Sequence, residues 1–230
     1  MPYSLTSKLD PILEEREREL LLAGFNYEEV AKAIGMSQAA VVKNRNRLVY
    51  RINIYEAFAR RIEREGIPNR LHASDTFCAW FSGFADGEGH FGCHRALYSK
   101  SRSGVSSRHI FLQISVRDDD IEVINYIKDT LNAGFVTRSP QRKHTNPAAH
   151  YRIGTVADLA EVIVPLFEKY PLHTKKSREF AIWKTLVKQS YIFTLGGHLR
   201  RVSVTDEQDL FFDEGVSAIR KNRIYVARII

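Results

Sequence analysis

Two acidic residues, Asp86 and Glu88, stand at the end of a segment rich in small residues. Ala79, Gly83 and Gly87 recur every four residues, so they share one face if the segment is helical. Glycine within a helix costs about 1 kcal/mol relative to alanine, and close approach of a second helix is the usual compensation. Two such helices packed together would bring their acidic ends side by side. Paired carboxylates around a small space are how proteins hold Mg²⁺ against phosphates, so the segment indicates metal-dependent phosphate chemistry.

The elements that must position these acids follow from capping residues and hydrophobic spacing. Ser74 or Asp75 is expected to cap a helix that runs to about Asp86. Further helices are predicted at 119–131, 156–170 and 175–189, and strands at 90–98, 109–117, 134–139 and 149–153. The polar stretch 99–107 is expected to join the first two strands as a hairpin loop. The order α-β-β-α-β-β-α-α predicts an α+β domain.

Alternation within strand 109–117 assigns its residues to two faces. The core face is expected to hold Ile110, Leu112, Ile114 and Val116. The opposite face is expected to hold His109, Phe111, Gln113, Ser115 and Arg117. Phe111 departs from the polar character of that face, and an aromatic ring there could contact a thymine methyl group.

A glycine–proline stretch near Gly66 separates this domain from an all-helical N-terminal region. Asp10 before Pro11 is expected to begin a first helix, and Asn26 with Glu29 forms a capping box for a second. A third helix is expected from Ser37 to about 48, and a fourth over 48–65. The predicted domains are a helical region at 1–66, a linker at 67–73, an α+β domain at 74–195, and an extension of unknown role at 196–230.

The second and third helices resemble a DNA-binding helix-turn-helix. Ala31 permits a close helix crossing, Gly35 permits a left-handed turn, and Val41 packs the two helices together. Residues early in the third helix would then face base edges or phosphates. The candidates are Ser37, Gln38, Lys43, Asn46 and Arg47. The alternative is an ordinary helical hairpin whose charges are solvated. A cationic run that continues through Arg60, Arg61 and Arg64 could contact phosphate.

The composition favours an anionic partner. Lys and Arg number 34 against 27 Asp and Glu, a formal net charge of +7, although a merely soluble basic protein has the same composition. Cys78 and Cys93 form no Cys-x-x-Cys pair, which argues against a disulfide scaffold or a zinc ribbon. No signal-peptide core and no membrane-length apolar run is present, so an intracellular, soluble protein without a membrane partner is expected.

The acidic segment resembles the LAGLIDADG motif of homing endonucleases in its Gly-Phe-x-Asp-Gly-Glu-Gly-x-Phe form, at 83–91. The stretch 113–119 is similar to the family's second strand entering its second helix. The stretch 171–178 is similar to the family's Pro-Leu-x-Thr-Lys-Lys segment. Residues 74–189 therefore align in order with this family. The resemblance implies an αββαββα half-saddle domain and, because one acidic motif is present, a homodimer on a long, near-palindromic DNA site.

The resemblance also implies a reaction and its residues. Glu88 matches the acidic ligand of the catalytic metal, Mg²⁺ or another divalent ion, with the Gly87 carbonyl as a further ligand. Lys175 matches the basic residue near the attacking water or the scissile phosphate, and Gln113 is a candidate for positioning solvent. The reaction would be hydrolysis of phosphodiester bonds on both strands of double-stranded DNA. Asp86 is expected to cap the helix or accept backbone hydrogen bonds rather than bind metal.

The saddle implied by the resemblance would lie over the major groove. The expected DNA contacts on its strands and loops are His94, His109, Ser115, Arg117, Arg138, Arg142, Lys143 and Arg152. Singly, each of these is more often a solvated surface side chain, whereas as a set they favour DNA.

Two alternatives to a homing endonuclease remain at this stage. One is a non-cutting transcription regulator that retains the fold, although such regulators usually lose the acid that Glu88 supplies. Their helix-turn-helix also generally follows the LAGLIDADG part, whereas here it precedes that part. The other is an intron RNA maturase, which nothing in the sequence indicates or excludes.

Overall fold

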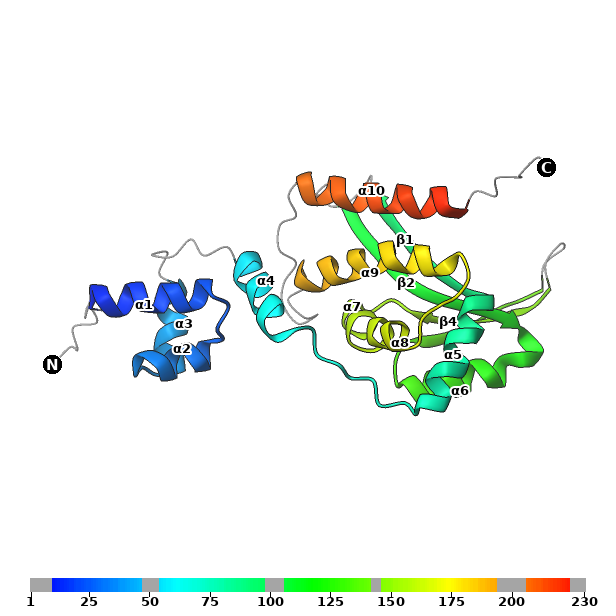
Figure 1. The fold of residues 1–230 in the computed structure, drawn as a ribbon, viewed down its shortest axis with the longest axis horizontal. Coiled ribbons are helices and arrows are strands. Elements are labelled where there is room, and N and C mark those ends of the chain that lie inside the picture. The colour runs from blue at the N-terminus through cyan, green and yellow to red at the C-terminus, as the bar shows by residue number, and fades with distance from the viewer. Residues whose placement is uncertain (1–9, 47–53, 98–105, 142–145, 194–205, 224–230) are drawn as a thin grey trace. The chain divides into compact units, whose positions relative to one another are not determined.

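The computed structural model divides the chain into two units, residues 1–66 and 67–230 (Figure 1). It describes residues 10–46, 54–97, 106–141, 146–193 and 206–223. No helix in these ranges is long and apolar enough to cross a membrane.

The first unit consists of helices, and the predicted starts of the first two are confirmed, whereas the predicted boundary between the third and fourth helices, near residue 48, lies outside the described residues. Its helices are α1 (Pro11–Leu22), α2 (Tyr27–Ile34), α3 (Gln38–Asn46) and α4 (Ile54–Glu65). The Asp10 carboxylate accepts the Ile12 amide at 2.9 Å, and Asn26 and Glu29 form the expected capping box. Gly35 adopts φ +69°, the left-handed turn predicted between the second and third helices.

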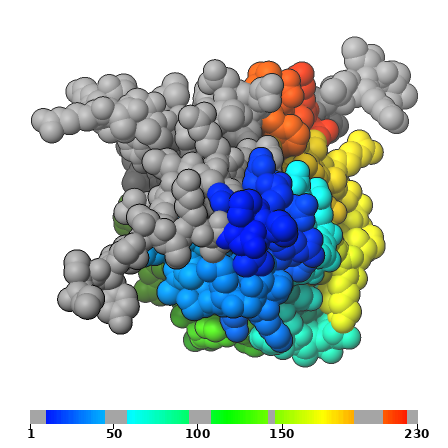
Figure 2. All heavy atoms as spheres, turned by 90° about the vertical axis from the view of Figure 1, so that its left-hand side faces the viewer, coloured from blue at the N-terminus to red at the C-terminus, as the bar shows by residue number. Residues whose placement is uncertain are grey.

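A small core joins the first three helices of this unit. Its fully buried members include Val30 and Val41, and Leu21 and Ala31 are 5% exposed. In Figure 2 the atoms of α1, in dark blue, lie directly against those of α2, in lighter blue.

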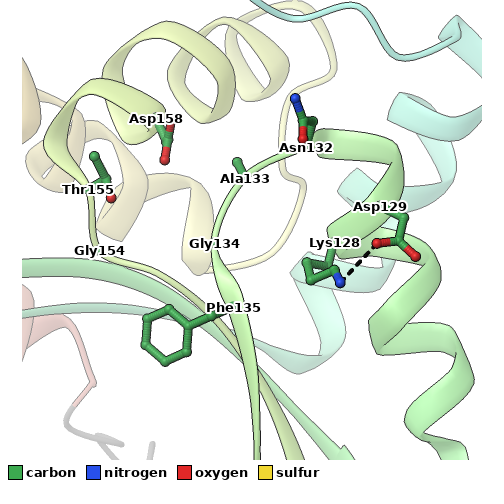
Figure 3. A pocket seen from close by; sticks show the side chains of 9 residues that line it. All are labelled: Lys128, Asp129, Asn132, Ala133, Gly134, Phe135, Gly154, Thr155 and Asp158. Atoms are coloured by element: carbon green, nitrogen blue, oxygen red, sulfur yellow. Dashed lines mark ion pairs between the residues drawn. The ribbon is translucent and has the colours of Figure 1, made fainter.

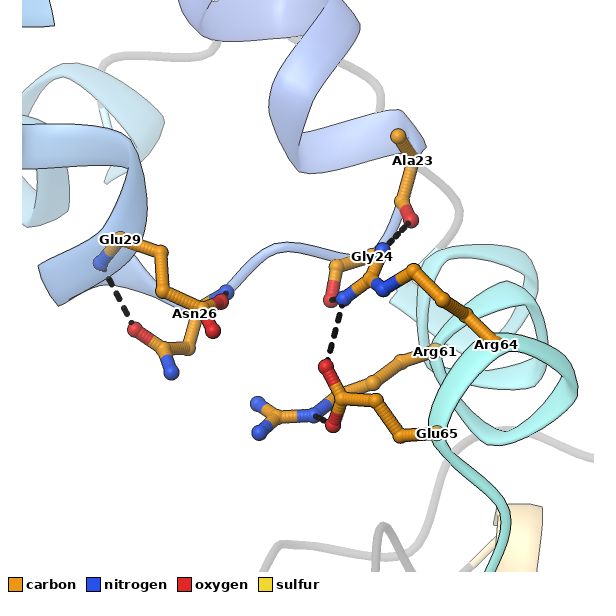
Figure 4. A network of polar contacts seen from close by, with 7 residues as sticks. All are labelled: Ala23, Gly24, Asn26, Glu29, Arg61, Arg64 and Glu65. Carbon is orange, nitrogen blue, oxygen red and sulfur yellow. Dashed lines mark hydrogen bonds and ion pairs between the residues drawn. The ribbon is translucent and has the colours of Figure 1, made fainter. Parts of the chain in front are cut away.

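Arginines of α4 that were predicted to contact phosphate make hydrogen bonds and ion pairs within this unit. Arg64 donates to the Ala23 carbonyl at 2.7 Å, and Arg60 donates to the Leu22 carbonyl at 2.9 Å. Both carbonyls lie at the end of α1, where helix geometry leaves acceptors unpaired. Arg61 instead pairs with Glu65 at 2.8 Å (Figure 4).

The second unit is a four-stranded antiparallel sheet with helices packed on one face (Figure 1). The strands are β1 (Gly89–Leu97), β2 (Ser106–Arg117), β3 (Phe135–Ser139) and β4 (Ala148–Ile153), in the order β1-β2-β4-β3. The helical elements are α5 (Asp75–Glu88), η1 (Asp118–Asp120), α6 (Ile121–Leu131), α7 (Val156–Asp158), the π-helical η2 (Leu159–Ile163), α8 (Val164–Lys169), α9 (Lys176–Phe193) and α10 (Asp206–Arg223). The α+β class and the order of these elements are confirmed.

The core lies between the sheet and the helices. Ile110, Leu112 and Ile114 of β2 are buried as predicted, whereas Val116 is only half-buried. Phe91 of β1 packs against Trp183 of α9, with ring centres 5.2 Å apart. We call the sheet face that these helices leave uncovered the open face.

Helix α10 belongs to this unit, whereas the sequence placed it in a separate extension. Phe212 and Ile219 are almost completely buried, and a Cβ at Gly215 would meet a Leu186 methyl at 2.7 Å. That glycine therefore lets α10 approach α9 closely. Arg223 pairs with the buried Glu179 of α9 at 2.9 Å.

Candidate functional site

The end of α5 is where the predicted acid lies. Ser74 caps this helix, and its hydroxyl accepts the Phe77 amide at 3.2 Å. The helix continues to Glu88 and passes directly into β1 at Gly89. A Cβ at Gly89 would lie 2.5 Å from the Ala85 carbonyl oxygen, so only glycine fits this junction. Glu88 is consequently held, exposed, at the point where helix becomes strand.

One face of α5 is open to a partner. Ala79, Gly83 and Gly87 are exposed, and a Cβ at either glycine would meet nothing within 4 Å. Trp80 lies beside them at 41% exposure, stacked on Phe84 with ring centres 5.4 Å apart. The structure therefore leaves the small-residue face unfilled in a single chain, as the packing of two such helices requires.

The Asp86 carboxylate accepts hydrogen bonds from the segment that precedes α9. Its oxygens accept the His173 amide at 2.8 Å, the Thr174 amide at 3.0 Å and the Thr174 hydroxyl at 2.6 Å. Burial opposes its ionisation, but these hydrogen bonds outweigh burial, and the pKa of Asp86 lies below its ordinary value. The expectation that Asp86 bonds backbone amides is confirmed.

The lysine that contacts the end of α5 is Lys176, not Lys175. Its ammonium donates to the Gly87 carbonyl at 2.6 Å and to the Ala85 carbonyl at 3.2 Å. Burial lowers the pKa of Lys176, and the nearby carboxylates of Asp86 and Glu88 act in the opposite direction. Lys175 is exposed, and its ammonium makes no hydrogen bond or ion pair within the described part of the chain, although its backbone carbonyl accepts the Arg178 amide at 3.2 Å.

This arrangement adds Lys176 to the predicted candidates Lys175 and Gly87, which stay predictions. Consecutive residues at a helix start project about 100° apart, so only one of two adjacent lysines can face α5. The Gly87 carbonyl, expected as a metal ligand, accepts the Lys176 ammonium here. Glu88 keeps its carboxylate exposed, without a hydrogen bond or ion pair to any described residue.

Gln113 lies on the open face beside this helix end. In the pairing of β1 with β2, Gly89 lies opposite Ile114 and His90 lies opposite Gln113. Glu88 directly precedes Gly89, so it stands at the same end of the sheet as Gln113. The Gln113 amide donates to the Ser115 hydroxyl at 3.2 Å.

A hydrogen-bonded chain continues from there across the open face. The Ser115 oxygen lies 2.8 Å from His150 Nδ1. His150 Nε2 in turn lies 2.9 Å from the Ser139 hydroxyl. Ser115, expected to contact DNA, is therefore part of a network that joins β2, β4 and β3.

Ring contacts join several other residues of the open face. His94 and His109 face each other across β1 and β2, stacked with ring centres 5.0 Å apart. The Arg152 guanidinium lies 3.6 Å from the centre of the Phe111 ring. Phe111 is only 8% exposed, so the expected contact of its ring with a thymine methyl is not available.

The other predicted DNA contacts have different positions. Arg117 is on the open face at the end of β2 and pairs with Asp119 at 2.8 Å. Arg138 pairs with Asp118 at 3.0 Å and lies opposite Ala149, whose side chain is buried on the helix-covered face. Arg138 therefore projects from the other face of the sheet, because strand residues alternate in direction.

In the first unit, α3 presents the predicted contacts only in part. Gln38 and Lys43 are exposed on α3. Arg47, Arg142, Lys143 and the side chain of Asn46 lie outside the described residues.

A hollow of about 620 Å³ lies elsewhere on the second unit, near the end of α6 (Figure 3). Its lining includes Phe135, Thr155 and Asp158. Lys128 and Asp129 at its rim pair with each other at 2.9 Å (Figure 3). None of the α5-end residues lines this hollow, so it is separate from the candidate site.

The exposed carboxylate at the end of α5 fits one ligand of a divalent metal. No group of three or more His, Cys, Asp or Glu side chains with metal-binding geometry occurs among the described residues. Mg²⁺ commonly takes one or two protein carboxylates together with phosphate oxygens and water. Glu88 would supply one such carboxylate, and the remaining ligands would come from outside this chain.

Comparison with known proteins agrees with this geometry. Residues 81–187 match the family model described as LAGLIDADG endonuclease. A protein of Neurospora crassa named "Probable intron-encoded endonuclease 2" is 27% identical over 129 residues, which cover 53% of this chain and 27% of that protein. The chain thus spans about a quarter of this curated relative.

Two solved structures share the fold. I-SmaMI bound to an uncleaved DNA target with calcium ions has a TM-score of 0.51 at 21% identity, covering 63% of this chain and 45% of that one. The archaeal intron-encoded homing endonuclease I-Vdi141I, complexed with DNA, has a TM-score of 0.51 at 15% identity, covering 68% of this chain and 89% of that one.

Proposed function

We propose that this chain, whose residues 81–187 match the LAGLIDADG endonuclease family model, is a site-specific DNA endonuclease that acts as a homodimer. The observation that carries the proposal is the end of α5. There an exposed Glu88 and the ammonium of Lys176 adjoin an unfilled small-residue face. Two copies packed through that face would bring two carboxylates and two lysines to one place.

A divalent metal would be held there by Glu88 of both copies together with phosphate oxygens. When bound, such a metal neutralises phosphate charge and activates water for hydrolysis. The Gly87 carbonyl is not needed as a ligand in this scheme, because Lys176 occupies it.

Lys176 would stabilise negative charge on the scissile phosphate. An ammonium has three N–H donors, and two are directed to the Gly87 and Ala85 carbonyls. The third remains for a phosphate oxygen. Because Asp86 ties residues 173 and 174 to the end of α5, the lysine is fixed before DNA arrives.

Gln113 would position water next to this centre. Its amide nitrogen is directed to Ser115, so the amide oxygen is left to accept a hydrogen bond from solvent. The chain of hydrogen bonds through Ser115 and His150 would hold that orientation.

The DNA would lie along the open face, which presents Arg152, Arg117 and the His94–His109 pair. The exposed Gln38 and Lys43 of the first unit would add a second contact with the same DNA. The excess of 34 Lys and Arg over 27 Asp and Glu favours this polyanion.

Cleavage of a randomised plasmid library in Mg²⁺ tests the proposal, with sequencing of double-strand ends. The wild-type chain is expected to produce ends at one sequence class, and Glu88→Gln is expected to abolish them. Glu122→Gln, which alters an exposed acid of α6, serves as the matched control and should cut normally. Sequence-specific binding without ends, in every divalent metal tried, would instead favour a non-cutting regulator.

A further inference from the structure

The centre of the open face holds a stack built from three strands. The Phe111 ring of β2 lies over Gly92 of β1, its register partner. A Cβ at residue 92 would lie 2.1–2.4 Å from the outer ring atoms, so only glycine leaves room for the ring. The Arg152 guanidinium of β4 lies 3.6 Å from the ring centre.

The exposures of these groups give the order of the stack. Phe111 is 8% exposed, whereas Arg152 is half-exposed. The guanidinium is therefore the group that a molecule on the open face would meet.

Arg152 differs from Arg117 and Arg138 of this sheet in its partners. Arg117 and Arg138 each pair with an aspartate. In the described part of the chain, no carboxylate or carbonyl accepts a hydrogen bond from the Arg152 guanidinium. A guanidinium that lies flat on an aromatic ring keeps its N–H groups at its edge, available to a third group.

We propose that Arg152 recognises one guanine in each half of the DNA site. The Phe111 ring supports the Arg152 guanidinium, and the absence of a side chain at Gly92 leaves room for that ring. This inference rests on the proposed function. The chemistry is specific to guanine because its O6 and N7 acceptors face the major groove and match the two parallel N–H groups of arginine. Phe111 and Gly92 are positioning residues, because they act only through Arg152.

One bidentate arginine–guanine pair gives about 5- to 150-fold preference over another base. Fixing the guanidinium on the ring before binding reduces the side-chain freedom lost in the complex. Lysine retains the charge but neither the planar fork nor the stacking, so it would bind DNA without this preference.

Selection of bound sequences from randomised DNA, in Ca²⁺ in place of Mg²⁺, tests the inference. The wild-type chain is expected to enrich one guanine symmetrically in both half-sites. Arg152→Lys should lower that preference by about 5- to 150-fold while the other selected bases persist. Gly92→Ala should weaken the same preference, because its Cβ displaces the Phe111 ring without touching Arg152. Arg138→Lys, which alters an arginine on the other face, should leave that base unchanged.

Each outcome is decisive. Selected sequences that are identical for the wild type and Arg152→Lys would overturn the inference but leave the proposed function intact. A guanine lost in Arg138→Lys and kept in Arg152→Lys would assign the contact elsewhere. A wild-type chain that enriches no sequence would refute the proposed function itself. Arg152 is half-exposed, so its variant tests the inference even if Gly92→Ala fails to fold.

Discussion

Replacing Lys176 by glutamine is expected to slow DNA cleavage far more than the same change at Lys175. The Lys176 ammonium lies 2.6 Å from the carbonyl oxygen of Gly87, the residue directly before Glu88. Lys175 is exposed, and its ammonium makes no polar contact within the described residues. The two lysines have the same charge and are adjacent in sequence, so each is the natural control for the other.

The magnitude follows from what each lysine does. Loss of one preorganised donor to a developing charge reduces the rate about 100- to 1000-fold, which is the loss expected for Lys176→Gln. Lys175→Gln removes only an exposed charge, for which the expected cost is within about 0.5 kcal/mol, or roughly twofold in rate. Each variant could lose one phosphate contact, so DNA affinity should change similarly in both.

Single-turnover cleavage of a selected site separates the chemical step from binding. The pH dependence adds a second test, because burial lowers the pKa of Lys176. Its positive charge is lost at a lower pH than that of an ordinary lysine, so the wild-type rate should fall as the pH rises through that pKa. Lys176→Gln should lack this descending limb. Equal rate losses in both variants, or a larger loss for Lys175→Gln, would refute the assignment.

Three further predictions concern assembly and stability. Gly83→Leu should leave the single chain folded, since a Cβ there meets nothing within 4 Å. In analytical sedimentation this variant should be a monomer, and an unchanged dimer would exclude this face as the interface. Burial raises the pKa of Glu17 in the folded state above its pKa in the unfolded state. The first unit should therefore keep its full stability at a pH below both pKa values and lose stability as the pH rises through them. Glu17→Gln should remove that dependence in hydrogen exchange of α1 to α3 and increase protection at neutral pH, and a persistent slope would assign it to another group. Gly134→Ala should lower the free energy of unfolding by at least about 1–2 kcal/mol in urea, because φ is +74° and the new Cβ would lie 2.6 Å from a carbonyl oxygen. Gly154→Ala, whose nearest atom is 3.9 Å away, should be nearly neutral.

Local features of this chain were predictable because their causes are local. The caps at Asp10, Asn26 and Ser74 depend on residues within three positions, and all three occur in the structure. The exposure of the small-residue face of α5 likewise follows from a spacing of four. The order of strands and helices in the second unit followed from alternation and from the family resemblance together.

Sequence reasoning missed features whose geometry is set by residues far apart in the chain. Which of two adjacent lysines faces α5 depends on where α9 begins, and that start is fixed by Thr174 and Asp86, 88 residues apart in sequence. The face on which Arg138 lies depends on the register of β3 with β4.

Helix α10 was missed although the buried Phe212, Val216 and Ile219 have helical spacing. That pattern could have identified the helix. Its attachment to α9, through Gly215 and through the pairing of Arg223 with Glu179, gave no local signal in the sequence.

A mixed dimer tests the central claim most directly, because the account requires one Glu88 from each of two chains. Wild-type and Glu88→Gln chains carrying different affinity tags would be co-expressed, and the mixed pair would be isolated through both tags. Double-strand cleavage of a selected site would then be compared with that of the wild-type pair at equal concentration. The account predicts that the mixed pair binds the site but makes no double-strand break. Double-strand cleavage at the wild-type rate would contradict a centre shared between two α5 helices.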